Sequence, residues 1–242
     1  HNEHAAVLAD ADVLRAVVEA AHPRGLWVAA HRDLTGAAEA ARLGADTIEH
    51  AWSLLEDGTD AARPAGEIDD AIAEMVARRT AFTPTLVAAE HAFTIADIAR
   101  EGSPAMPYVP RFMRRFWIST QINNASAAGM GAEEIARRRA RLEQLKELVG
   151  RVHRAGGRVL AGTDAPAYLV APGFDIHREL ELLVESGLTP AHALAAATSE
   201  AASALGRGSE IGALSPGMRA DLIIVAGDPL GEGAGNAPAI SA

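Results

Sequence analysis

Three short apolar runs, each ending in a side chain that can bind a metal ion, constrain the fold of this chain most strongly. They span residues 26–31, 45–50 and 158–164, and they end in His31, His50 and Asp164. Short apolar runs are typical of buried parallel strands, and in a β/α barrel the residues just past the carboxyl ends of the strands face the active site. The sequence therefore predicts two histidines and an aspartate at one end of a parallel sheet.

The segments between these runs have the spacing of helices, which supports a β/α alternation. Apolar positions recur at helical intervals over residues 11–21, and residues 36–43 form a short helical stretch closed by Gly44. Residues 67–79 have the same spacing and precede a further strand-like run, residues 81–86, with Pro84 near its end. Alternation of this kind predicts parallel β/α units.

The middle and the end of the chain depart from the alternation. Residues 90–157 are expected to form a long, mostly helical insertion that contains one amphipathic surface helix. After Asp164 we expect a loop, a helix over residues 176–185 and a second helix that starts at Thr189 and Pro190. Residues 222–225 are apolar and, after Leu222, β-branched, so we divide the chain into residues 1–208 and a C-terminal β segment with a flexible tail, residues 209–242.

Charge and composition exclude several classes of function. The net charge of −10 argues against nucleic-acid binding, which requires clustered cations, and favours a small-molecule substrate. The chain has no cysteine, so a metal site must use His, Asp or Glu. No run approaches the roughly 18 apolar residues that a membrane span needs, so we expect no membrane contact and a cytoplasmic location. Because the first residue is His1, not Met, we expect that either a leader has been removed or, more simply, the chain is the downstream part of a longer one.

Three stretches of the sequence together resemble the metal-dependent amidohydrolase superfamily, in its dipeptidase-like and imidazolonepropionase-related branch. The matching residues are 28–31 with 43–50, then 160–164 with 177–190, and finally 193–198 with 211–212 and 216–222. The resemblance implies an α/β fold that is part of a (β/α)8 TIM-type barrel, strands five to eight, with a helical insertion and a C-terminal β segment.

By this resemblance His31, His50 and Asp164 are the metal ligands, and Asp164 also transfers the proton. The implied cofactor is zinc, with one or two divalent ions in the intact parent. Neutral imidazole suits zinc, which lowers the pKa of bound water to about 7, and a nearby carboxylate can accept the proton. The implied reaction is hydrolysis of an amide or another non-aromatic C–N bond. His177 is expected to contact the substrate, or else to be an exposed residue in the first turn of a helix.

Two family features are missing from the sequence. The family also uses a His-x-His pair after its first strand and, in two-metal members, a carboxylated lysine after its fourth. This chain has no His-x-His, and its only lysine is Lys146, on the predicted amphipathic helix. Four β/α units leave two open strand edges, so we expect a homo-oligomer or pairing with a missing N-terminal half.

Three readings of the function remain open at this point. The first is a hydrolase of dipeptide-like or cyclic amides; a deaminase is disfavoured because Leu34 stands where deaminases typically have a glutamate. The second is a catalytically incomplete half-barrel that pairs with another chain and binds a ligand without turnover. The third is a solute-binding scaffold. Tyr108, Phe112, Phe116 and Trp117 could form a lid, although core packing of the insertion is the preferred interpretation.

Overall fold

The computed structural model describes residues 11–31, 36–55, 64–101, 105–117, 132–225 and 227–230. The chain divides into two compact units. The first, unit 1, comprises His1–Pro84, Leu148–Leu160 and Ala195–Leu222. The second, unit 2, comprises Thr85–Glu147, Ala161–Leu194 and Ile223–Ala242.

Unit 1 contains a parallel sheet of four strands. These are β1 (Ala29–Ala30), β2 (Thr47–Glu49), β3 (Ala81–Thr83) and β4 (Arg158–Val159), in the order β1-β2-β3-β4. Ile48 of β2 pairs with Ala30 on one side and with Phe82 on the other, and both Ile48 and Phe82 are almost fully buried. The predicted parallel β/α architecture is therefore confirmed, as a partial TIM-type sheet that the described residues do not close into a barrel.

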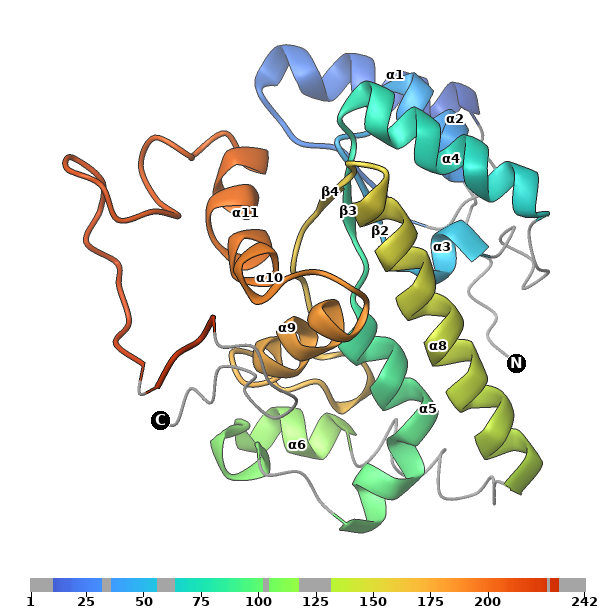
Figure 1. The fold of residues 1–242 in the computed structure, drawn as a ribbon, viewed down its shortest axis with the longest axis vertical. Helices are drawn as coiled ribbons and strands as arrows, with labels where there is room; N and C mark the ends of the chain where they lie inside the picture. Colours follow the sequence, from blue (N-terminus) through green and yellow to red (C-terminus); the bar gives the residue numbers. More distant parts are fainter. Residues whose placement is uncertain are drawn as a thin grey trace. The chain divides into compact units, whose positions relative to one another are not determined.

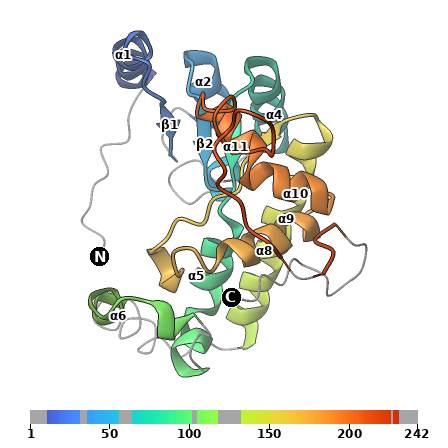
Figure 2. The same cartoon turned by 90° about the vertical axis from the view of Figure 1, so that its left-hand side faces the viewer.

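The helices of unit 1 precede, connect or follow its strands. They are α1 (Ala11–Ala21), η1 (His22–Arg24), α2 (Gly36–Leu43), α3 (Trp52–Leu55), α4 (Ala65–Arg78) and α11 (Ser199–Ala204). Helices α1, α2 and α4 lie side by side in that order (Figures 1 and 2). The buried face of α2 is made of alanines, among them Ala40 and Ala41, and such small side chains allow neighbouring elements to approach closely.

A carboxylate and a glycine that precede β2 hold the β/α units of unit 1 in register. The Asp46 carboxylate accepts hydrogen bonds from the Val28 amide at 2.7 Å and from His22 Nε2 at 3.1 Å, which links the starts of β1 and β2. Gly44 ends α2 with φ of 99°, and a Cβ at this position would lie 3.2 Å from Val18. The sequence-predicted glycine stop thus serves both the turn and the packing of α1 against α2.

Unit 2 is built from helices and loops in the part of the chain that the structure describes. They are α5 (Leu86–Glu101), η2 (Met106–Tyr108), α6 (Arg111–Trp117), η4 (Ala167–Leu169) and α9 (Ile176–Glu185). Helices α8 (Ala132–Arg154) and α10 (Pro190–Ala197) begin in unit 2 and end in unit 1. A core cluster joins Trp117 and Val109 to Leu169. No helix in the described residues has the length and apolar character needed to span a bilayer.

The side chains of two glutamates fasten α9 to the first turn of α5. The Glu179 side chain is fully buried, and its Oε2 accepts a hydrogen bond from the Val87 amide at 2.7 Å. Burial raises the pKa of Glu179 to about 8, so this carboxyl group holds its proton at neutral pH. Beside it, Arg178 donates two hydrogen bonds to the Glu90 carboxylate, at 2.6 and 2.8 Å. These contacts fix the helix that carries His177.

The C-terminal region differs from the prediction. Residues 222–225 form no strand, and Leu222, Ile223 and Ile224 are all more than half exposed. Local β propensity is not sufficient, because a strand exists only when a neighbour satisfies its backbone groups. The predicted strand over residues 158–164 is likewise shorter, since only Arg158 and Val159 pair with β3. The division at residue 208 stays a prediction, and residues 231–242 of the predicted tail lie outside the described residues.

The fold predicts a large difference between two phenylalanine truncations. Phe82→Ala should destabilise the chain by about 3–5 kcal/mol, because it empties the centre of the sheet, where Phe82 has no solvent exposure. Phe112→Ala should change stability by no more than about 0.5 kcal/mol, since Phe112 is 73% exposed. Urea unfolding followed by circular dichroism measures both, and equal effects would contradict this description of the core.

Candidate active site

The parallel pairing of β1 and β2 brings two of the predicted site residues together. His31 follows β1 directly and His50 follows β2 directly, and Ala30 pairs with Ile48 in the shared register. The imidazole rings have their centroids 4.7 Å apart and meet edge to face, with 75° between their planes. Two side chains that are 19 positions apart in the sequence thus share one site at the carboxyl end of the sheet.

The backbone at His50 directs the chain into α3. His50 has φ of 65°, an uncommon left-handed conformation for a residue with a side chain, and its amide donates to the Thr83 carbonyl at 2.8 Å. The turn that follows stacks Trp52 on the His50 ring, with centroids 4.3 Å apart and 6° between the planes. The His50 ring is therefore in contact with two other rings: His31 in an edge-to-face arrangement and Trp52 in a stacked one.

The surroundings of His50 favour a neutral imidazole. Burial, and secondarily the neighbouring His31, lower the pKa of His50 from 6.5 to about 4. A neutral ring keeps a nitrogen lone pair available at neutral pH, and this is the form in which histidine binds metal ions. The His31 ring is more open to solvent, so the pair has one buried and one accessible member.

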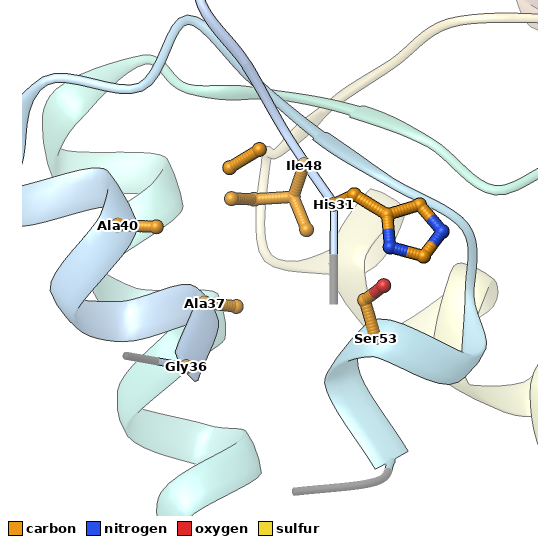
Figure 3. Close-up of a pocket in the computed structure, with 7 residues that line it drawn as sticks. His31, Gly36, Ala37, Ala40, Ile48 and Ser53 are labelled. Carbon is orange, nitrogen blue, oxygen red and sulfur yellow. The ribbon is translucent and has the colours of Figure 1, made fainter. Parts of the chain in front are cut away.

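A small pocket lies beside His31 (Figure 3). Its volume is about 10 Å³, about the smallest space that holds one water molecule. The lining is otherwise mainly apolar and includes Ala37, Ala40 and Ile48, but it also contains the hydroxyl group of Ser53. Sequence patterns gave no reason to select Trp52 or Ser53. Their only signal is that they lie two and three residues, respectively, after His50.

Asp164 lies in unit 2, beyond the end of β4. Its φ is 56°, and its carbonyl accepts a hydrogen bond from the Ala167 amide at 2.9 Å. Two residues later, the Pro166 carbonyl accepts a hydrogen bond of 2.8 Å from the indole of Trp117, which is almost fully buried. The insertion thus anchors the loop that carries Asp164. Within the described part of the chain no three His, Asp or Glu side chains form a metal-binding group, so the convergence of Asp164 with the histidines stays a prediction.

His177 lies in the first turn of α9, also in unit 2, and is partly buried. Its Nδ1 is buried and has no hydrogen-bond partner among the described residues. Contact of His177 with a substrate therefore stays a prediction. Lys146 pairs with Glu143 at 2.7 Å and with Glu185 at 3.0 Å, which gives the only lysine of the chain a structural role on α8.

The aromatic residues of the insertion divide into two groups. Trp117 packs in the core of unit 2, as the preferred interpretation predicted. Tyr108, Phe112 and Phe116 are each more than half exposed, so the packing prediction is wrong for these three. Their short elements, η2 and α6, bury one face only and leave the other rings on the surface, where Tyr108 stacks on Phe174 at 5.5 Å.

The lowered pKa of His50 predicts a defined dependence of stability on pH. Between pH 6.5 and about 4 the unfolded chain binds a proton at this residue and the folded chain does not. The free energy of unfolding of the metal-free chain should therefore fall as the pH is lowered through this window. His50→Gln should remove that part of the slope, and NMR should show the His50 ring titrating near pH 4. Titration of the His50 ring near pH 6.5 would contradict the lowered pKa of this residue.

Comparison with known proteins identifies the family. The model of the Amidohydrolase family matches residues 2–241. No curated protein matches. Among solved structures, a protein provisionally described as a prolidase from Bifidobacterium longum is 27% identical, with a TM-score of 0.61 over 91% of this chain and 46% of that one.

Two further structures support the same fold. A bottromycin amidohydrolase is 26% identical, with a TM-score of 0.62 over 81% of this chain and 44% of its own. A Xaa-Pro dipeptidase with bound methionine is 23% identical, with a TM-score of 0.61 over 91% of this chain and 44% of its own. The chain spans less than half the length of these proteins. Its sequence and its strand order agree with the family match over nearly the whole chain, and the chain belongs to the amidohydrolase family.

Proposed function

We propose that this chain carries the metal-binding half of an active site that hydrolyses an amide or another non-aromatic C–N bond. The substrates that we favour are dipeptide-like molecules or cyclic amides. The observation that carries the proposal is the contact between His31 and His50 at the carboxyl ends of adjacent parallel strands, with their centroids 4.7 Å apart. The kinship with a bottromycin amidohydrolase and with a protein provisionally described as a prolidase supports the choice of substrate class.

The residues of the site fit a zinc ion. Zinc binds imidazole nitrogens at about 2.0–2.1 Å and carboxylate oxygens at about 2.0–2.2 Å, and it does not require cysteine. His31 and His50 supply two adjacent imidazoles, and burial keeps the second of them neutral. We propose Asp164 as the third ligand. A bound zinc ion would polarise a substrate carbonyl and lower the pKa of a coordinated water molecule to about 7.

The side chains of this chain would then have the following roles. His31 and His50 hold the site at the sheet, and Trp52 restricts the rotation of the His50 ring by stacking on it. Asp164 accepts the proton that leaves the attacking water and delivers it to the departing nitrogen. Trp117 restrains the Asp164 loop through the Pro166 carbonyl, and His177 contacts the substrate.

A second candidate function is supported by a separate observation. The sheet of the described residues is open, with β1 and β4 at its edges, and Lys146 is engaged in ion pairs on α8. The chain would then be a catalytically incomplete half-barrel that pairs with a second copy or with a complementary chain. It would bind zinc and ligand without turnover. Analytical ultracentrifugation combined with an assay of Xaa-Pro dipeptides and lactams separates the two candidates, because only the first predicts hydrolysis.

Zinc titration tests the site itself. Wild-type chain should bind zinc, and His31→Ala or His50→Ala should each weaken binding at least tenfold by removing one of few ligands. His192→Ala, which removes an exposed histidine elsewhere in the chain, is the matched control and should bind as wild type does. Isothermal titration calorimetry measures the affinities. Equal binding by all variants would show that zinc binds elsewhere and would refute the proposed site.

A further inference from the structure

The hydroxyl group of Ser53 has no explanation in the packing of unit 1. Ser53 is 4% exposed, and its Oγ has no hydrogen-bond partner among the described residues. Burying a hydroxyl group without a partner is unfavourable, and such groups are uncommon in folded proteins. The side chain therefore points to a requirement other than packing.

The chain places this hydroxyl group next to His31 through the turn at His50. The Ser53 amide donates to the His50 carbonyl at 3.1 Å, and the next residue of α3, Leu54, is fully buried. Ser53 and His31 line the same pocket, and the Ser53 Oγ points toward the side of the His31 ring that carries a nitrogen (Figure 3). The other lining residues, such as Ala40 and Ile48, offer no polar side chain to either group.

The size of the pocket limits how the Ser53 hydroxyl group and the His31 ring can interact. A volume of about 10 Å³ accommodates one water molecule at most. A water molecule there could accept the N–H of the His31 ring and donate to the Ser53 oxygen, while the hydroxyl group keeps its own proton for a further partner. In metal sites the ring nitrogen that does not face the ion is commonly held in this way, which fixes the tautomer and the orientation of the ring.

We propose that Ser53 is a positioning residue for His31, whose hydroxyl group orients the imidazole through one water molecule so that the opposite ring nitrogen faces the metal ion. The inference rests on the proposed function, because it assigns a partner to a proposed ligand. It adds a residue that lies on α3 and that acts on the metal site through His31.

The experiment compares Ser53→Ala with a matched serine. Ser186 is also buried, but its hydroxyl group donates to the Leu182 carbonyl at 2.7 Å in unit 2. Ser53→Ala should change the midpoint of thermal unfolding of the metal-free chain by no more than about 2 °C, because the loss of one hydrogen bond through water is offset by no longer burying a hydroxyl group. It should also weaken zinc binding by about 10- to 100-fold. Ser186→Ala should lower the midpoint and leave zinc affinity unchanged.

A second measurement does not depend on zinc. The ¹⁵N chemical shifts of the His31 ring report its tautomer, and Ser53→Ala should shift the tautomer populations in the metal-free chain. A Ser53→Ala variant that binds zinc as well as wild type and keeps the same His31 shifts would overturn the inference and leave the proposed function intact. Absence of zinc binding by the wild-type chain would instead overturn the proposed function, and the His31 shifts would still decide whether Ser53 orients the ring.

Discussion

The register between β1 and β2 is the constraint on which the rest of the site depends. Because Ala30 pairs with Ile48, the residues that follow the two strands leave the sheet next to each other. The side-chain period of a strand is two residues, so a slip of one position would turn one imidazole away from the other. The Asp46 carboxylate, which binds the Val28 amide at the start of β1, and the glycine turn before β2 both secure this register.

The contacts of His50 determine the protonation state of its ring. Its left-handed backbone lets α3 start at once, which places Trp52 on the ring and buries it. Burial then keeps the imidazole neutral, and the same turn carries Ser53 under His31. One backbone conformation therefore determines the protonation of one histidine and the surroundings of the other. In unit 2 the indole of Trp117 restrains the loop of Asp164 through its hydrogen bond to the Pro166 carbonyl.

The sequence predicted the elements whose signal is local. Apolar runs identified all four strands, and glycine or proline marked helix ends at Gly44, Gly187 and Pro190. His31 and His50 could be selected because each follows a strand directly. Ser53 could not, since a serine in a short apolar helix acquires a role only when the helix brings it to a neighbour in space. Glu179 was missed for a similar reason, because a glutamate on an amphipathic helix is expected at the surface. The exposed residues 222–225 show the converse error, in which β propensity has no partner strand to act on.

X-ray absorption at the zinc edge tests the central claim most directly, because it counts the ligands of the ion. We expect two imidazole nitrogens at about 2.0–2.1 Å from the zinc ion in the wild-type chain, and one fewer in His31→Ala or in His50→Ala. A spectrum without imidazole scattering, or one that is unchanged when both histidines are replaced, would contradict it.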